Sequence, residues 1–311
     1  MCTAFTLTDS GFYMGRNFDL EYSYGERPTL TPRNYPFLFT DGTVCAHHEM
    51  LLGMAYVRDG CPLYYDAMNE SGLVMAGLSF PGYAHYEKAE PGAGKVAPHE
   101  LISYVLTQCK SVSEAKTFLR DKTIADIPVS ADLANTPLHW FIADRRASLA
   151  VEAMDNGLHL WDDPMAVLTN APPLPFQFDR LRDYRGLSPD AGANRFSPRM
   201  PLECYSRGMG AIGLPGDFSS CARFVRAAYV KENTVTEPTP DGCVNRVFHI
   251  LDSVKVPRGC VRTEEGADTA TLYSACFDVP RGKFWYETYD EPARRCVSFS
   301  DAGAEREVTV F

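Results

Sequence analysis

The chain has 311 residues, enough for one large domain or two ordinary ones, and its 45% hydrophobic and 23% charged residues are typical of a globular protein with a sizeable core. Its formal net charge of −10 argues against a nucleic-acid partner, because such a partner requires a basic surface and the sequence contains no basic run. No apolar run approaches the roughly 20 residues that a membrane-spanning helix needs.

The first nineteen residues predict a hairpin of two strands. Apolar and polar residues alternate on both sides of a turn at residues 8–11, as they do in half-buried strands. A four-residue loop there pairs Leu7 with Phe12, and counting back along both strands places Arg16 opposite Thr3. This pairing predicts a cation beside the start of the first strand.

Cys2 is the candidate nucleophile at that strand start. It follows the initiator methionine, and cysteine is small enough for Met1 to be removed, which leaves a thiol and a free α-amine on one residue. An α-amine titrates at about pH 8, so it can accept the proton that the thiol loses on becoming a nucleophile. A cation such as Arg16 favours the thiolate, and Asp19 can orient that cation or the amine. The alternative is that Cys2 is an accident of the start site and Arg16 a surface charge.

Short strands occupy the region up to residue 79, and helices follow. Residues 27–60 alternate apolar runs with Pro, Gly and Asp, and residues 62–79 predict two strands joined by a turn. The His-His-Glu run at residues 47–49 is not predicted to bind a metal, because neighbouring residues of a strand point to opposite faces. Helical spacing of apolar residues begins after Pro98 and again after Ser111, which offers an N-cap.

Residues 137–170 return to the pattern of strands. His139 and His159 lie inside these strand-like runs, and each is interpreted as a hydrogen-bonded structural histidine rather than a base. Residues 171–216 are rich in Pro, Gly and Arg, which predicts long active-site or packing loops.

The last third of the chain predicts two more helices and closing strands. Helical spacing resumes at residues 219–230 and 244–254, and strand patterns fill residues 271–299. Strands, two helices, strands, two helices and strands in this order predict two sheets between two helical layers. Since no linker or repeat is evident, we expect a single domain over residues 2–311, after removal of Met1.

Several motifs in the same order resemble the choloylglycine hydrolase family, which contains the bile salt hydrolases and penicillin V acylases and belongs to the N-terminal nucleophile hydrolases. The matching segments are spread over most of the chain, at residues 1–3, 15–19, 22–26, 69–73, 80–84, 168–170, 214–220 and 223–226. The resemblance implies an α+β fold, a four-layer αββα sandwich of two mainly antiparallel sheets. It also implies that the thiol of residue 2 attacks an amide and forms a thioester that water hydrolyses.

The resemblance further assigns roles to charged and polar residues. Arg16 and Asp19 would hold and tune the nucleophile, and Asn170 would supply a side-chain N–H to the oxyanion. Arg223 would complete the charged network. Arg226 is its rival for that role, and the alternative for Arg226 is a charge on a helix surface.

One position departs from the pattern of bile salt hydrolases. Ser79 stands where they usually have Asn as the second oxyanion donor, and serine has a shorter reach and a single donor. Penicillin V acylases tend to have Tyr here, so Ser79 favours neither branch. We expect activity to be retained with an altered rate or substrate range.

The substrate pocket is expected to be apolar, since a steroid or phenoxyacetyl group requires it. The candidate lining residues are Met14, Phe18, Leu20, Tyr24, Phe80 and Tyr83. Residues 205–210 resemble the family's selectivity loop, in which Arg207 would pair with a sulfonate or carboxylate tail. The alternative for Arg207 is a solvated loop residue.

Together with the residues above, the resemblance implies a bile salt hydrolase that cleaves glycine- or taurine-conjugated bile acids without a metal or other cofactor. A penicillin V acylase, or another N-acyl amide hydrolase or acyltransferase, is the close alternative, and a non-catalytic ligand-binding protein is the alternative from another class. The ten cysteines are scattered, form no CxxC and follow no apolar leader, so we expect reduced thiols in the cytoplasm. We expect no nucleic-acid or membrane partner. The resemblance implies a homo-oligomer, commonly a tetramer.

Overall fold

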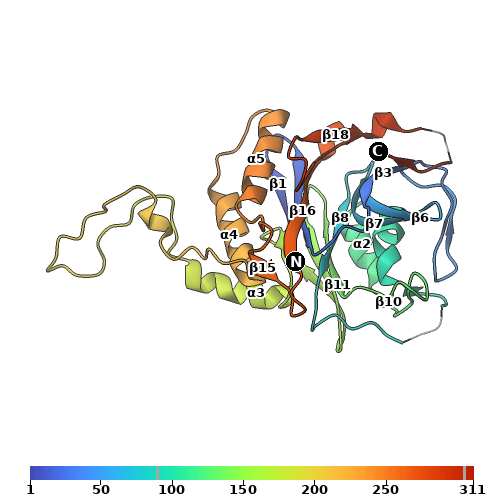
Figure 1. Ribbon diagram of the computed structural model, residues 1–311, viewed down its shortest axis with the longest axis horizontal. Helices are drawn as coiled ribbons and strands as arrows, with labels where there is room; N and C mark the ends of the chain where they lie inside the picture. Colours follow the sequence, from blue (N-terminus) through green and yellow to red (C-terminus); the bar gives the residue numbers. More distant parts are fainter. Residues whose placement is uncertain (89–90, 304–305) are drawn as a thin grey trace.

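Two large antiparallel sheets lie face to face at the centre of the computed structural model, which describes residues 1–88, 91–303 and 306–311 (Figure 1). The first sheet has the strand order β14-β1-β2-β16-β17-β18, with β15 also paired to β16. Its strands are β1 (Cys2–Thr8), β2 (Phe12–Leu20), β14 (Val167–Leu168), β15 (Val261–Arg262), β16 (Asp268–Asp278), β17 (Lys283–Thr288) and β18 (Arg295–Ser298).

The second sheet has the order β13-β12-β11-β8-β7-β6-β3-β19. Its strands are β3 (Arg27–Thr31), β6 (Leu51–Arg58), β7 (Cys61–Asn69), β8 (Val74–Ser79), β11 (Leu138–Ala143), β12 (Ser148–Met154), β13 (Gly157–Asp162) and β19 (Thr309–Val310). Two small two-stranded sheets pair β4 (Phe37–Leu38) with β5 (Val44–Cys45), and β9 (Lys95–Val96) with β10 (Thr123–Ile124).

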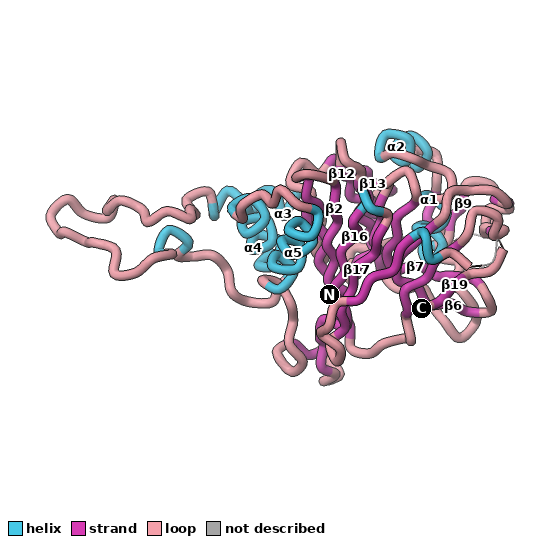
Figure 2. Tube along the Cα trace, turned by 90° about the horizontal axis from the view of Figure 1, so that it is seen from above, coloured by secondary structure: helices cyan, strands magenta, loops and turns pink. Residues whose placement is uncertain are grey.

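Helices cover the outer faces of both sheets. Figure 2 shows α3, α4 and α5 on one side of the strands and α1 and α2 on the other. The helices are α1 (Leu101–Leu106), α2 (Val112–Leu119), α3 (Leu174–Leu181), α4 (Ser220–Asn233) and α5 (Pro240–Asp252). Short 3-10 turns are η1 (Pro98–Glu100), η2 (Arg182–Tyr184), η3 (Met209–Ala211), η4 (Val279–Arg281) and η5 (Phe299–Asp301). The predicted αββα arrangement is confirmed.

Capping side chains explain where three helices begin. Ser111 accepts a hydrogen bond from the backbone N–H of Glu114 at the start of α2. Ser219 caps α4 in the same way, and Thr239 caps α5. Helix α5 begins at Pro240, four residues before the predicted start, because proline suits the first turn of a helix.

Strands β1 and β2 are covered on both faces, and the two faces have different neighbours. Even-numbered residues of β2 face the second sheet, as the ion pair between Arg16 and Asp66 on β7 shows. Odd-numbered residues face the helices, since the Asn17 side chain donates to the backbone of Leu251 on α5. Gly15 lies so close to that helix layer that an added Cβ would stand 2.8 Å from a methyl group of Val247. This alternation decides where each side chain of the hairpin points.

The histidines of the strand region have structural partners. His139 is fully buried, and its ring nitrogens lie 3.3 Å from Glu152 Oε1 and 3.1 Å from the Thr169 carbonyl oxygen. The ring of His159 stacks on Trp161, 5.1 Å between centroids. Nε2 of His159 also lies 2.7 Å from Asn156 Oδ1, so both rings have the hydrogen-bond partners expected of structural histidines.

The segment between η2 and α4 was predicted as loop, and it projects away from the sheets (Figures 1 and 2). Among regular elements, only η3 interrupts it. Helix α3, which precedes η2, also lies within residues 171–216, where the Pro-rich composition concealed it. Among the described residues, no helix is long and apolar enough to cross a bilayer.

Candidate active site

Cys2 opens β1 and pairs with Phe18 on β2, and its side chain is almost completely buried. The hairpin register differs from the prediction by one residue. Phe12 pairs with Thr8 and not with Leu7, so the loop has three residues instead of four, and Arg16 pairs with Ala4. The predicted register, with Arg16 opposite Thr3, was therefore wrong.

The correction matters because a one-residue shift moves a side chain to the other face of a sheet. Opposite Thr3, Arg16 would point toward the helices and away from the thiol. Opposite Ala4, it shares the face of Cys2, and its guanidinium lies 3.8 Å from Cys2 Sγ. The structure thus brings the two residues together as expected, by a different pairing.

Arg16 is fixed from the opposite sheet by a residue that the sequence analysis missed. Its Nε lies 2.7 Å from Oδ2 of Asp66 on β7, and both side chains are fully buried. The hydroxyl of Tyr273 on β16 donates to the same carboxylate oxygen. A carboxylate inside a strand of buried residues needs a charged or hydrogen-bonding partner. The position of Asp66 within such a strand was therefore the sequence feature that could have identified it.

Burial and charge act in opposite directions on these groups. Burial alone lowers the pKa of Arg16, but the neighbouring Tyr273, Cys2 and Asp66 outweigh it and raise that pKa above its ordinary value. Burial raises the pKa of Asp66, against the Arg16 guanidinium and the Tyr273 hydrogen bond. Arginine stays protonated in either case, so a positive charge stands beside the thiol.

Asn170 follows β14 and lies against the backbone nitrogen of Cys2. Its Oδ1 accepts from that nitrogen at 2.7 Å and from Arg223 Nη2 at 2.5 Å, while its Nδ2 donates to the Ser79 carbonyl oxygen at 2.7 Å. The hydroxyl of Ser220, at the first residue of α4, accepts from the Asn170 backbone N–H at 2.9 Å. One side-chain N–H of Asn170 thus remains for another acceptor.

Arg223 comes from the first turn of α4 and contacts Cys2 from the helix side. Its Nη1 lies 2.5 Å from the Cys2 carbonyl oxygen and 2.8 Å from Thr3 Oγ1. Arg226 instead donates to the backbone carbonyl oxygens of Ser253 and Pro215. Of the two candidate arginines, the structure therefore brings Arg223 to Cys2.

Asp19 follows Phe18, the residue that pairs with Cys2, and it is fully buried. Its Oδ1 accepts from the Thr271 hydroxyl at 2.6 Å, and its Oδ2 lies 3.9 Å from Arg223 Nη1. Its carbonyl oxygen accepts from the amino group of Met1 at 2.8 Å. With Met1 in place, the nitrogen of Cys2 is an amide, and its 2.7 Å contact with Asn170 marks where the amine of a processed chain would lie.

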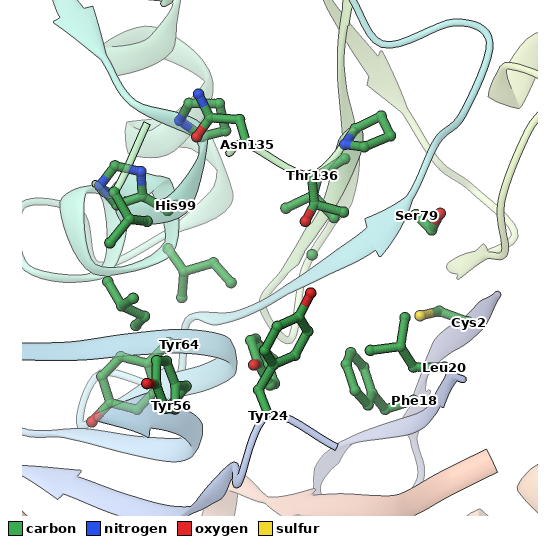
Figure 3. A pocket seen from close by; sticks show the side chains of 18 of the residues that line it. Cys2, Phe18, Leu20, Tyr24, Tyr56, Tyr64, Ser79, His99, Asn135 and Thr136 are labelled. Carbon is green, nitrogen blue, oxygen red and sulfur yellow. The ribbon is translucent and has the colours of Figure 1, made fainter. Parts of the chain in front are cut away.

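A cavity of about 380 Å³ opens beside Cys2 (Figure 3). The expected lining residues Phe18, Leu20 and Tyr24 are part of its wall, together with Asp19 and Ser79. It continues between the second sheet and the segment of η1 and α1, where Ile102 and Trp140 are part of its wall. A cavity of this size and lining accommodates a small apolar molecule.

The other predicted pocket residues lie elsewhere. Met14 is buried in the core, and Phe80 stacks between His139 and Tyr83, with centroids 4.3 and 5.5 Å away. Arg207 is exposed on the projecting segment. These four predicted residues, Tyr83 included, do not line the cavity.

Several lining residues had no signal in the sequence. His99 lies in η1, and Asn135 and Thr136 precede β11; their positions in the cavity depend on how distant elements pack. Among the described residues, no group of His, Cys, Asp and Glu has the arrangement of a metal site. The ring of His47 contacts Asn34, and that of His48 contacts the backbone of Tyr35.

Comparison with known sequences finds similar proteins over nearly the whole chain. The model of the linear amide C–N hydrolases, choloylglycine hydrolase family, matches residues 2–303. A bile salt hydrolase/transferase of Lactiplantibacillus plantarum is 43% identical over 300 residues, which cover 96% of this chain and 93% of the relative. A conjugated bile acid hydrolase of Lactobacillus acidophilus is 36% identical over 285 residues, 89% of each protein.

Solved structures show the same fold. A variant of the conjugated bile acid hydrolase of Clostridium perfringens has a TM-score of 0.90 at 30% identity, covering 100% of this chain and 96% of the other. A penicillin V acylase of Agrobacterium tumefaciens has a TM-score of 0.77 at 20% identity, covering 96% and 87%. The similarity to the acylase extends to the fold alone.

Proposed function

The chain belongs to the choloylglycine hydrolase family of linear amide C–N hydrolases, and on this premise we propose that it hydrolyses the amide bond of glycine- or taurine-conjugated bile acids. The single observation that supports this most is the placement of Cys2. Its sulfur lies 3.8 Å from Arg16, and the residue lines a largely apolar cavity. Its relatives of known name act on bile salts and conjugated bile acids.

We propose that the mature chain begins at Cys2. The thiol gives its proton to the α-amine, and the sulfur forms a bond with the amide carbon of the substrate. The resulting oxyanion is stabilised by the remaining N–H of Asn170, with Ser79 at the same end of the cavity. The amine returns the proton to the leaving nitrogen, and the C–N bond breaks to leave a thioester on Cys2.

Water then completes the reaction. It adds to the thioester carbon while the amine takes a proton from it, and the C–S bond breaks to release the free bile acid and the thiol. Arg223 and Asn170 contact the backbone of Cys2 rather than its sulfur. We therefore assign them the role of fixing the nitrogen and carbonyl of the nucleophile, while Arg16 supplies the charge beside the sulfur.

The direct test combines mass and activity. Intact-mass measurement of the purified protein should show that Met1 is absent, and the protein should release taurine from taurocholate and glycine from glycocholate. Cys2→Ser should abolish both reactions with the fold intact by circular dichroism. An active preparation that retains Met1 would refute the mechanism. Faster cleavage of penicillin V than of either conjugate would assign the acylase activity instead.

We also propose that residues 2–311 form one domain that works in the cytoplasm as a homo-oligomer. The two sheets share the buried Arg16–Asp66 pair, which supports one domain. The ten cysteines are free, which is consistent with a reducing compartment. Phe196 and Tyr205 on the projecting segment are 87% and 85% exposed, and a second copy of the chain would cover them.

The oligomer proposal also gives Arg207 a place. Arg207 is two positions after Tyr205, on the segment that would meet a second copy of the chain. In the oligomer, its guanidinium would pair with the sulfonate or carboxylate of a substrate. Sedimentation of wild type and of a Phe196→Ser/Tyr205→Ser variant tests the assembly, and the variant should dissociate. Arg207→Ala should change the ratio of taurocholate to glycocholate turnover; an unchanged ratio would remove Arg207 from the site.

A further inference from the structure

A buried histidine and a buried glutamate contact each other on the second sheet. His139 on β11 and Glu152 on β12 lie on adjacent strands, and both side chains are fully buried. Nδ1 of the imidazole lies 3.3 Å from Oε1 of the carboxylate. Ionisable side chains are seldom buried unless they are paired, and the proposed mechanism gives this pair no role.

The pair holds both ends of the short segment that contains Asn170. Nε2 of His139 lies 3.1 Å from the carbonyl oxygen of Thr169, the residue before Asn170. Because a carbonyl oxygen can only accept, Nε2 carries a hydrogen and donates it. Oε1 of Glu152 accepts from the backbone N–H of Leu174, the first residue of α3, at 3.1 Å. The segment of residues 169–174 is therefore anchored to the second sheet on both sides of Asn170.

The carboxylate is itself fixed by a third donor. Nε1 of Trp161 on β13 donates to Oε2 of Glu152 at 2.9 Å. An indole N–H and a backbone N–H can only donate, so both carboxylate oxygens act as acceptors. A buried polar network in which every member is hydrogen-bonded is rigid. His139 and Glu152 thus form a rigid support behind the segment.

The same histidine also supports the residue that binds the Asn170 side chain. Its ring stacks on that of Phe80, with centroids 4.3 Å apart and an angle of 7° between the planes. Phe80 follows Ser79, whose carbonyl oxygen accepts from Nδ2 of Asn170 at 2.7 Å. His139 therefore acts on Asn170 from two directions, through the backbone of Thr169 and through the acceptor at Ser79.

The position of Asn170 matters because one N–H of its side chain is assigned to the oxyanion. Such a donor has to lie about 2.7–3.1 Å from the oxyanion, and loss of one donor costs roughly 100–1,000-fold in kcat. Nδ2 gives its other hydrogen to Ser79. A movement of the segment would therefore turn the free N–H away from the oxyanion even though Asn170 is still present.

We propose that His139 and Glu152 are positioning residues for hydrolysis, which fix residues 169–174 so that the free N–H of Asn170 points at the oxyanion. This inference rests on the proposed function, because it extends the role given there to Asn170. Neither His139 nor Glu152 lines the cavity, so both act through Asn170. Ser220 and Arg223 also contact Asn170, at 2.9 and 2.5 Å, so loss of the pair should displace Asn170 without releasing it.

Two substitutions of His139 test the donated hydrogen. His139→Leu removes the N–H that Thr169 accepts, and its kcat for taurocholate should fall about 10–100-fold. KM should stay within about threefold of wild type, because the oxyanion contact exists only in the transition state. His139→Gln keeps an N–H for Thr169, and its kcat should stay within about fivefold of wild type. An equal fall in both variants would overturn the inference, since only one of them lacks the donor.

Alkylation of Cys2 by iodoacetamide separates the position of Asn170 from the state of the thiol. The sulfur forms a bond to a saturated carbon and iodide leaves, so no oxyanion forms. The rate for His139→Leu should stay within about threefold of wild type while kcat falls, because Arg16 still lies at the sulfur. The ten cysteines are free, so the rate is measured by mass spectrometry on the N-terminal peptide. A parallel fall of both rates would place the defect at the thiol and overturn the inference.

Asn69→Leu is the matched control. Asn69 is a buried polar residue of the same sheet, and its Nδ2 donates to the backbone carbonyl oxygens of Leu106 and Cys109. It ends β7 and precedes the start of β8, whereas Ser79 lies at the other end of β8. The change should lower Tm and leave kcat within about threefold of wild type. A loss of kcat equal to that of His139→Leu would attribute the effect to general destabilisation and overturn the inference.

The proposed function and this inference fail in different ways. If wild type cleaves neither taurocholate nor glycocholate, the proposed function fails, and hydrogen exchange still tests the support of residues 169–174. The peptide that contains them should exchange faster in His139→Leu than in wild type and at an unchanged rate in Asn69→Leu. Equal exchange in the three proteins would overturn the inference.

Glu152→Gln decides if His139→Leu does not fold. It replaces one accepting oxygen by an NH₂ group, which cannot accept from Leu174 or Trp161. Its kcat should fall about tenfold with KM unchanged, because residue 174 is then less firmly held. A kcat equal to that of wild type would show that the carboxylate does not position Asn170, and the inference would be wrong.

Discussion

The ion pair between Arg16 and Asp66 joins the two sheets behind the nucleophile, and Asp66→Asn is the sharpest perturbation of it. The change keeps the shape of the side chain but leaves the fully buried guanidinium without its carboxylate 2.7 Å away. Removal of one partner of a buried pair costs about 3–5 kcal/mol. For 311 residues this corresponds to a decrease in Tm of about 5–8 °C.

The activity of Asp66→Asn should fall because the Arg16 guanidinium is displaced, and not because the thiol is lost. Without Asp66, nothing on the second sheet fixes Arg16 against the sulfur, and a displacement of about 1 Å at a reacting group can cost roughly 100-fold in rate. We therefore expect kcat for taurocholate to fall by about 10–100-fold while Met1 is still removed, as intact mass would show. Tyr273→Phe removes only a hydrogen bond to Asp66 and should cost about 1–3 kcal/mol.

The double variant Arg16→Met/Asp66→Asn separates stability from catalysis. It removes the uncompensated charge, so its free energy of unfolding should exceed that of Asp66→Asn, with a coupling energy of about 2 kcal/mol or more. It should be inactive, because the guanidinium is gone. Thermal and urea unfolding measure the first result, and taurine release measures the second. Additive destabilisation in the double variant would refute the reasoning that the two charges depend on each other.

Three further predictions follow from packing, backbone contacts and titration. Gly53→Ala should destabilise the protein by about 3 kcal/mol, as measured by urea unfolding, because an added Cβ would stand 2.0 Å from the backbone oxygen of Asp66. Arg226→Met should lower stability by about 1–3 kcal/mol and retain taurine release, since its partners are backbone carbonyls, whereas Arg223→Met should abolish release. Burial holds the pKa of His99 in the folded chain below its ordinary value of 6.5, so the unfolded chain binds more protons at this residue. Wild type should therefore lose stability relative to His99→Gln as the pH falls through 6.5. Parallel profiles of Tm against pH for the two proteins would contradict this.

The hairpin shows what sequence patterning can and cannot determine. Alternation of apolar residues predicted both strands and the proximity of Arg16 to Cys2. It did not determine whether the loop has three or four residues, because either length is compatible with Asp, Ser and Gly at the turn. That single residue decides which face Arg16 occupies.

The start of α2 was predictable from the capping side chain of Ser111, and the predicted start of α4 at residue 219 coincides with its cap, Ser219. Helix α3 was missed because proline is frequent in loops, although Pro173 precedes its first turn and proline is well tolerated there. The resemblance to a family identified Asn170 and favoured Arg223 over Arg226, which spacing alone could not do. The contacts of Arg223 with Cys2 depend on α4 packing against β1.

The end of the cavity farthest from Cys2 was not predictable for a different reason. His99 and Asn135 are separated by more than thirty positions in the chain and by two helices, and neither belongs to a motif. They line the same end of the cavity because η1 and the segment before β11 both contribute to its wall (Figure 3). Cavity-lining residues of this kind depend on the packing of distant elements, so a local pattern does not reveal them.

The sulfur, the carbonyl and the nitrogen of Cys2 are fixed from three different parts of the fold. Arg16, anchored on the second sheet through Asp66, lies at the sulfur; Arg223 from the helical layer lies at the carbonyl; and Asn170, after β14, lies at the nitrogen. None of these partners is close to Cys2 in the sequence, so an unfolded chain presents an ordinary cysteine. Reactivity therefore arises only when the sheets and α4 have packed. For the same reason, a change that separates the sheets should remove activity before it unfolds the chain.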